Sequence, residues 1–310
     1  TYGNIIRTPV QIMSSGVSAV ALGGSHTCII RMDGSMWCWG GNWAGQLGDG
    51  THGVDDCIST LSGLECNINP TFITTGVKSM SLGWIHTCAI KVDGSLWCWG
   101  YNGYGQLGDG TNSSKNTPIQ IMSSGVSSVA AGQGHTCAIK TDGSLWCWGS
   151  SPVGDGTWTS KNTPVQIMSS GVLAVSLGDS HTCAVRTDGS LWCWGYSGFL
   201  GDGVRGNFIG GETLGGSIPI PARIMSWGVS SVSLGAEHTC AIKTDGSLWC
   251  WGGGWLGNGT DIGSNTPIQV ISSGVSSVAL RSFHTCAIKI DGSLWCWGDN
   301  YYGQLGNGTY

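Results

Sequence analysis

Charged side chains are scarce in this sequence. Asp, Glu, Lys and Arg make up 10% of the 310 residues, against about 25% in an ordinary soluble domain. The 13 basic residues form no cluster, and the formal net charge is −5. Because nucleic-acid binding needs a patch of Lys and Arg that neutralises phosphates, the sequence predicts no nucleic-acid partner.

Two hydrophobic patterns are also missing. No apolar run approaches the ~18 to 20 residues that cross a bilayer as a helix, so we expect no membrane insertion. No helical period of about 3.6 residues persists over about ten residues, which excludes a helical solenoid. What the chain has instead is 54 Gly, well above the average of about 7%, and this abundance indicates many short strands joined by turns.

One phrase occurs six times. HTCIIRMDGSMWCWG begins at His26, and close variants begin at His86, His135, His181, His238 and His284. Successive copies are 46 to 60 residues apart. Propeller blades typically repeat every ~40 to 50 residues, so the mean spacing is in the range of propeller blades. Most copies are preceded by TPxQI and a Val- and Ser-rich segment, and most are followed by a phrase such as GQLGDGT.

Each repeat predicts four strands. The Val- and Ser-rich segment, HTCAIK, SLWCWG and TPxQI are short apolar runs, and the Asp-Gly turn between the second and third is a strong hairpin signal. Pro places TPxQI at a sheet edge. We therefore predict an all-β fold, a six-bladed β-propeller of four-stranded blades that forms a single domain over residues 1–310; a β-solenoid is the alternative.

The ends of the chain predict how the propeller closes. The last repeat stops at LGNGTY without a TPxQI strand, whereas residues 8–12 (TPVQI) precede the first repeat. We expect this N-terminal strand to close the last blade, because an open edge would be a template for pairing with another chain. Insertions at about residues 52–69 and 204–217 are candidate specificity loops, expected on the same rim.

The cysteines predict a disulfide in each hairpin. If residues 32–34 form a three-residue turn, Cys28 lies opposite Cys38 at a non-hydrogen-bonded position, where Cα atoms are about 4.5 Å apart. Cys57 and Cys66 form a seventh expected bridge inside the first insertion. The predicted pairs are Cys28 with Cys38, Cys57 with Cys66, Cys88 with Cys98, Cys137 with Cys147, Cys183 with Cys193, Cys240 with Cys250 and Cys286 with Cys296.

Zinc is the competing interpretation, because each repeat has a His two residues before a Cys. A spacing of ten residues between cysteines is unlike the close pairs of metal sites, so we favour disulfides. Disulfides persist in oxidising compartments, which predicts an extracellular or cell-surface protein.

The repeated His and Asp residues do not predict an enzyme. A residue used identically in every repeat is more typical of a structural role, such as satisfying a backbone hydrogen bond, and Asp before Gly is ordinary turn chemistry. We find no nucleophile with its base, and the Asp-Gly phrases supply too few oxygens for calcium. We therefore predict no catalysis and no cofactor.

Surface residues supply weaker candidates. Twelve of the 17 Trp lie in the WCW phrases, where we expect them to fill the gaps between blades. The others are candidate binding residues, because exposed Trp is common at binding hot spots: Trp43, Trp84, Trp158, Trp227 and Trp255. Possible glycosylation sites are Asn112, Asn258 and Asn307.

The full repeat, GxxHTCAIKxDGSLWCWGxNxxGQLGDGT, resembles that of the regulator of chromosome condensation. The resemblance covers all six units and implies a propeller whose first and last segments share a blade. Nucleotide exchange and chromatin binding belong to intracellular members of that family, and ultraviolet-B sensing needs a special Trp cluster. Secreted members that grip other proteins agree better with this chain, which has six units where seven are commonest.

Two functions follow. The first is a secreted or cell-surface structural module for assembly or adhesion, such as a filament or sheath subunit. The second is a secreted binder or inhibitor of a protein or glycan that uses the loops of one face. The predicted partner is a protein or further copies of the chain, with a glycan possible.

Thiol titration tests the disulfide prediction. Protein denatured without reductant should show no free thiol, because each hairpin brings its two cysteines face to face. Stoichiometric zinc together with 14 titratable thiols would contradict this prediction and establish the metal site.

Overall fold

The structure is a computed structural model that describes residues 9–53, 67–196, 198, 200–204, 207–209, 212–214 and 217–309. All regular secondary structure in these ranges is β-strand. Across the same ranges there is no helix that is long and apolar enough to span a membrane. The predicted all-β class is confirmed.

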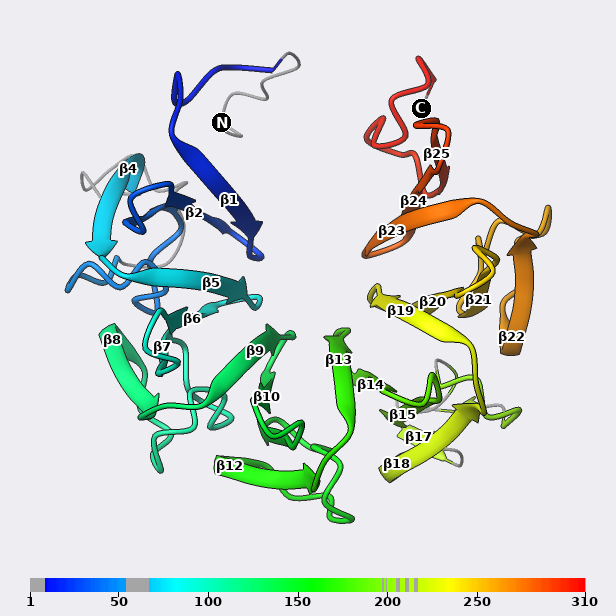
Figure 1. The fold of residues 1–310 in the computed structure, drawn as a ribbon, viewed down its shortest axis with the longest axis horizontal. Coiled ribbons are helices and arrows are strands. Elements are labelled where there is room, and N and C mark those ends of the chain that lie inside the picture. The colour runs from blue at the N-terminus through cyan, green and yellow to red at the C-terminus, as the bar shows by residue number, and fades with distance from the viewer. Residues whose placement is uncertain are drawn as a thin grey trace. The chain divides into compact units, whose positions relative to one another are not determined.

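The chain divides into two compact units, Thr1–Thr136 with Lys161–Pro164 and Cys137–Ser160 with Val165–Tyr310. The first unit contains two complete four-stranded sheets (Figure 1). Their strands are β1 (Val17–Leu22), β2 (His26–Arg31), β3 (Met36–Gly40) and β4 (Asn67–Thr74), then β5 (Val77–Leu82), β6 (His86–Lys91), β7 (Leu96–Gly100) and β8 (Lys115–Met122).

A third sheet contains residues of both units. Its strands are β9 (Val126–Ala131), β10 (His135–Lys140), β11 (Leu145–Gly149) and β12 (Lys161–Met168).

The second unit holds the remaining sheets. One comprises β13 (Val172–Leu177), β14 (His181–Arg186), β15 (Leu191–Gly195) and β18 (Ile218–Met225). The next comprises β19 (Val229–Leu234), β20 (His238–Lys243), β21 (Leu248–Gly252) and β22 (Ser264–Ile271). The last has three strands, β23 (Val275–Arg281), β24 (His284–Lys289) and β25 (Leu294–Gly298).

The six sheets have the predicted strand order. In each, the Val- and Ser-rich strand pairs with the HTC strand, which pairs with the WCW strand, and in five sheets the Pro-bearing strand follows at the edge. Residues 9–12, the described part of the expected closing segment, form no strand. Closure of the last blade by residues 8–12 therefore stays a prediction.

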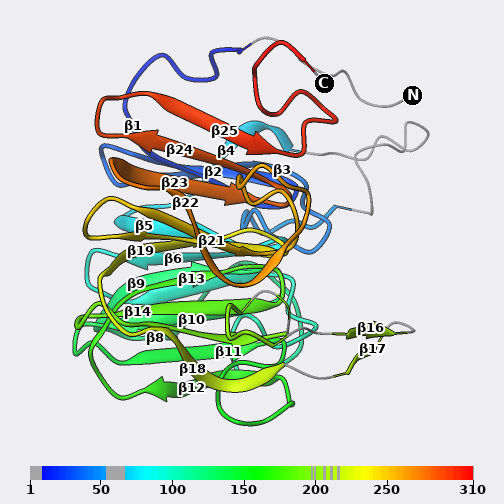
Figure 2. The ribbon, with the colours of Figure 1, turned by 90° about the vertical axis from the view of Figure 1, so that its right-hand side faces the viewer.

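The two insertions differ in how much of them the structure describes. In the second, β16 (Asn207–Ile209) and β17 (Glu212–Leu214) pair as a two-stranded sheet, and Figure 2 shows them projecting beyond the strands of the second unit. Most of the first insertion, including Cys57 and Cys66, lies outside the described residues. That both insertions share a rim stays a prediction.

Each hairpin turns at the predicted Asp-Gly. Gly34 has a φ of 76°, which an L-residue with a side chain rarely adopts. The Asp33 carboxylate accepts hydrogen bonds from the backbone N–H and the hydroxyl of Ser35, and these bonds lower the pKa of Asp33. The Ser35 hydroxyl in turn accepts from the indole N–H of Trp37 at 3.0 Å. The repeated Asp thus closes a turn, as the sequence indicates.

The turn sets the register that places the cysteines opposite each other. Cys28 pairs with Cys38 in the β2–β3 ladder, as counting out from the turn predicts. A disulfide joins them, their Cα atoms are 4.1 Å apart, and both side chains are fully buried.

The same bridge recurs in the other five sheets, with the same Cα separation of 4.1 Å. These bridges join Cys88 to Cys98, Cys137 to Cys147, Cys183 to Cys193, Cys240 to Cys250 and Cys286 to Cys296. All six predicted hairpin pairs are therefore present, and one covalent bridge spans the central hairpin of every sheet. The seventh pair, Cys57 with Cys66, stays a prediction.

Neighbouring sheets within a unit share their cores. In the first unit, one apolar cluster joins Met36 and Leu47 of the first repeat to Val77 and Trp99 of the second. The indole of Trp99 donates to the carbonyl of Gln46 at 3.1 Å. Figure 1 shows β1, β5 and β9 side by side along one edge of the first unit.

The expectation that both Trp of each WCW phrase fill inter-sheet gaps is half wrong. The second Trp is fully buried in the second to fifth repeats, as Trp99 and Trp251 show, and half-buried in the first and sixth. The first is half-buried, because alternation along the strand turns it to the other face of its own sheet. There Lys91 lies 4.6 Å from the ring centroid of Trp97, and Trp37 packs edge-on against Phe72.

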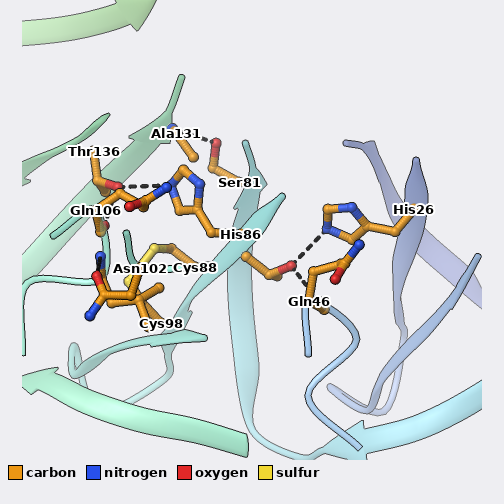
Figure 3. The surroundings of a disulfide bond; sticks show 12 residues. His26, Gln46, Ser81, His86, Cys88, Cys98, Asn102, Gln106, Ala131 and Thr136 are labelled. Carbon is orange, nitrogen blue, oxygen red and sulfur yellow. Dashed lines mark hydrogen bonds between the residues drawn. A yellow bond between two sulfur atoms is a disulfide. The ribbon is translucent and has the colours of Figure 1, made fainter. Parts of the chain in front are cut away.

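The repeated His residues connect one sheet to the next. The Thr87 hydroxyl donates to the Gln46 carbonyl at 2.8 Å, so its oxygen accepts from Nε2 of His26, also at 2.8 Å. His86 contacts Thr136 in the same way at 2.9 Å (Figure 3). Equivalent bonds join His181 to Thr239 and His238 to Thr285. The expected role is therefore structural, but the partner is a side chain of the neighbouring sheet instead of a backbone group.

Burial keeps these imidazoles neutral. It lowers the pKa of His86 to about 3 and the pKa of His26 to about 4, from 6.5. Below pH 6.5 the unfolded chain therefore takes up protons that the folded chain refuses. The free energy of unfolding must fall as the pH drops from 6.5 toward these folded values.

A His86→Gln variant tests this linkage, because the Gln amide retains a donor for Thr136. The wild-type chain should lose about 2 kcal/mol of stability from His86 alone between pH 7 and pH 5, and the variant should lose that much less. Urea unfolding at both pH values measures the difference. The exposed His52→Gln is the matched control; a His86→Gln curve as steep as the wild type would contradict the assignment.

Candidate binding surface

The loop after the third strand is built around an Asn in the first, second and sixth repeats. In the second repeat the buried Asn102 side chain accepts from the backbone N–H of Leu107 at 2.9 Å and donates to Asp109 at 3.0 Å. Asn42 of the first repeat and Asn300 of the sixth form corresponding bonds. Because one side chain satisfies both limbs of the loop, the loop is held in a single conformation.

In the first four repeats the tip of this loop is hydrogen-bonded to the outer strand of the following repeat. The N–H of Gly50 donates to the Asn116 carbonyl at 2.8 Å, and the Asn116 amide donates back to the Gly50 carbonyl at 2.8 Å. The same two reciprocal hydrogen bonds, here called a latch, join Gly110 to Asn162 and Gly203 to Asn265. These latches fix the loops relative to the next sheet.

Aromatic side chains gather where these loops meet the next repeat. Trp43 lies 5.7 Å from Tyr101, which lies 6.1 Å from Tyr104, measured between ring centroids. Trp158 lies 6.3 Å from Tyr196. The third group starts with Trp255, 6.2 Å from Phe283. Each group joins two successive repeats at the same end of their sheets.

All five candidate Trp side chains are exposed. Trp84 belongs to the same loop end, since its carbonyl accepts from the N–H of Gly24. Trp227 does not: it packs against Lys243, at 5.0 Å, and Lys243 ends the strand β20 that His238 begins. Four of the five candidates therefore lie at the loop end, and Trp227 lies at the opposite end.

A cavity of about 570 Å³ opens beside Trp255. It lies within the second unit, between the loop that follows β21 and the loop that follows β25. Sequence reasoning selected only Trp255 from its lining and missed Glu237, Phe283, Tyr301 and Tyr302. The sequence did contain a signal, because Leu256 follows Gly252 by four positions in the fifth repeat, whereas Leu305 follows Gly298 by seven in the sixth.

The remaining sequence-based candidates are metal ligands and glycosylation sites. Among the residues that the structure describes, no three His, Cys, Asp or Glu side chains are grouped to hold a metal ion. Asn112, Asn258 and Asn307 are exposed, and the last two accept hydrogen bonds from Thr two residues later. Their glycosylation stays a prediction.

The RCC1-like domain matches residues 3–310, nearly the whole sequence. The chain belongs to the RCC1-like domain family. RUG3, a mitochondrial RCC1 domain-containing protein of Arabidopsis thaliana, is 28% identical over 119 residues, which are 38% of this chain and 25% of RUG3. The chain thus matches about a quarter of the length of this curated relative.

Solved structures of the same fold come from different settings. Prp20p of Saccharomyces cerevisiae, described with its binding to Gsp1p and histones, gives a TM-score of 0.75 at 21% identity, over 95% of this chain and 74% of Prp20p. The ectodomain of the receptor kinase CR4 of Physcomitrella patens gives a TM-score of 0.54 at 19% identity, over 96% of this chain and 64% of the ectodomain. The likeness establishes an RCC1-like propeller fold, here with a disulfide in each central hairpin.

Trp255 allows a test of backbone strain at this surface. Its φ of 61° lies in the left-handed region, which costs a non-Gly residue about 1 to 2 kcal/mol. Trp255→Gly should therefore lose about 1 to 2 kcal/mol less stability than Trp158→Gly, whose Trp has a similar ring contact without a positive φ. Urea unfolding measures both. Trp255→Ala and Trp158→Ala are the controls, because Ala at position 255 retains the backbone strain. If the two Ala variants differ in stability as much as the two Gly variants do, strain is not the explanation.

Proposed function

We propose that this RCC1-like propeller is a non-catalytic binding module of the extracellular space or cell surface, which holds a protein or glycan partner with the aromatic loops described above. The observation that carries the proposal is the set of exposed aromatic side chains at one end of the sheets, on loops of which the first four are hydrogen-bonded to the outer strand of the next repeat. Rigid aromatic groups bind with little loss of conformational entropy, so they are well suited to recognition.

The disulfides support the extracellular setting. Six bridges, five of them fully buried, occur in one chain among its described residues, and such bridges persist in oxidising compartments. A likeness to a receptor-kinase ectodomain is consistent with this setting. The mitochondrial relative points the other way, but a reducing compartment would open the bridges on which every central hairpin depends.

The chemistry of the repeated residues supports a role without catalysis. The side chains of His26 and His86 are neutral, buried and bonded to Thr, and the hairpin Asp side chains bond to Ser in their own turns. Each therefore has a structural use that accounts for its repetition. The long insertions at about residues 52–69 and 204–217 would add selectivity next to the outer strands.

Partner screening tests this proposal. The oxidised chain is screened against displayed extracellular proteins and an array of glycans, and a partner found there is titrated with a triple variant that combines Trp43→Ala, Trp158→Ala and Trp255→Ala. We expect this triple variant to weaken binding at least about tenfold, because hot-spot Trp residues contribute about 2 kcal/mol or more each. Trp227→Ala, at the other end of the sheets, is the control; equal binding by the triple variant and wild type would contradict the proposal.

Self-assembly is a second candidate, favoured by a separate observation. The outer faces of the first and last sheets are uncovered: Val20 is 64% exposed, and Leu294 is 66% exposed where its counterpart Leu248 is fully buried. In addition, β25 has no further partner strand among the described residues. Residues 8–12 of a second copy would supply the missing edge strand by β-augmentation.

Deleting residues 1–12 distinguishes assembly from closure within one chain. Under assembly, sedimentation velocity should show loss of oligomers while the melting temperature of the monomer stays unchanged. A lowered melting temperature of a protein that is monomeric from the start would contradict assembly and support closure of a single propeller domain.

A further inference from the structure

The cavity beside Trp255 lies where the fifth repeat departs from the loop pattern of the second. In the second repeat the corresponding loop is longer, and Asn102 organises it. In the fifth repeat this loop is three residues shorter and has no Asn, because Gly253 and Gly254 follow Gly252 directly. The shortened loop leaves about 570 Å³ of open volume between itself and the next repeat.

Aromatic rings form much of the cavity wall. Trp255 and Phe283 contact each other edge-on, with their planes at 80°, and Tyr301 and Tyr302 contact each other in the same manner, with centroids 4.9 Å apart. All four side chains are exposed. Two ring pairs at right angles present both faces and edges to the space between them.

Three carboxylates share this wall. Glu237, Asp261 and Asp299 line the cavity, and no Lys or Arg is among its described lining residues. Asp299 accepts from the Tyr301 N–H and the Gln304 amide, which fixes it in place. None of the three forms an ion pair with any residue that the structure describes. Their negative charge has no cation to offset it.

The position before the repeated His is informative. It holds Ser25, Ile85, Gly134 and Ser180 in the first four repeats, and Phe283 in the sixth. The fifth repeat alone has an acidic residue there, Glu237; its short loop is shared with the third repeat, in which Val153 likewise follows Gly149 by four positions. Its Gly253 N–H donates to the Glu237 carbonyl at 2.7 Å, so the loop holds Glu237 at the cavity mouth.

We propose that this cavity binds an organic cation: an alkylammonium or guanidinium head group, such as that of a Lys or Arg side chain of a protein partner. The aromatic faces attract the cation through their quadrupoles, and the carboxylates neutralise its charge. A neutral sugar would use the rings but leave the three negative charges unpaired. The assignment deepens the proposed function, since it names the chemical group that one of the aromatic loops recognises.

Choline is the first probe, because its neutral isostere 3,3-dimethylbutan-1-ol has the same shape without the charge. Isothermal titration should show choline binding at least about tenfold more tightly than the isostere. Protein carrying ¹⁵N-labelled Trp should show the Trp255 indole N–H, assigned with Trp255→Phe, shifting with choline and with Nα-acetyl-lysine methylamide. Equal affinity for the isostere, or no shift of that indole, would overturn the proposal.

Charge-removing variants locate the site. Glu237→Gln and Asp261→Asn should each weaken choline binding about five- to tenfold, whereas Asp245→Asn, at the opposite end of β20, should leave it unchanged. Circular dichroism of each variant verifies folding. Binding of calcium or of neutral oligosaccharides that is lost in the same two variants, with no choline binding, would overturn the cation assignment.

The choline test and the partner screen fail independently. A chain that binds choline but whose partners ignore the aromatic loops would retain the cation site and lose the proposed function. A chain whose partners depend on those loops but which ignores choline would lose only the cation site.

Discussion

Burial of the second Trp of the WCW phrase between two sheets, complete in the second to fifth repeats, is the interaction on which the rest of the structure depends. A four-stranded sheet of short strands has too little apolar surface to cover such a side chain, so each sheet needs the next one. Trp99 shows how closely the two fit, because a Cβ on Gly48 would lie 2.5 Å from its indole nitrogen. The surrounding hydrogen bonds, from His26 to Thr87 and from Trp99 to Gln46, then fix the position of one sheet on its neighbour.

Two kinds of restraint act at different levels. Disulfides hold the strands of a single hairpin together, as between Cys88 and Cys98, and contribute nothing across the boundary between sheets. Apolar packing and neutral hydrogen bonds act across that boundary. Only 10% of the residues are charged, and Lys115 with Asp109 is an example of an ion pair among them. A chain of low charge can therefore be rigid without a network of salt bridges.

Sequence reasoning was most successful where the repeat determines geometry. Strand order, the Asp33-Gly34 turn and the opposition of Cys28 to Cys38 follow from the length of a turn and the two-residue period of strands. The role of Thr87 and the two-sided environment of the WCW phrase were missed, because both depend on a neighbouring sheet. Closure by residues 8–12 also requires a long-range contact that no local pattern fixes.

The cavity was missed for the same reason. Its walls come from two repeats, and one of them is a shortened loop, in which a missing residue does not attract notice. Trp255 was selected because it departs from the repeat, whereas Tyr301 and Tyr302 follow the repeat's normal spacing and were overlooked. Departures from a repeat, including missing residues, are therefore better guides to function than the repeat itself.

The central claim is that the aromatic loops form a rigid, preorganised surface, and native-state hydrogen exchange of the oxidised chain tests it most directly. The Leu107 N–H is bound by the buried Asn102 side chain, so it should exchange as slowly as the N–H groups of β6 and β7, and Asn102→Ala should speed its exchange selectively. Exchange of the Leu107 N–H within seconds in the unmodified protein would show that the loop opens freely, and would contradict the account.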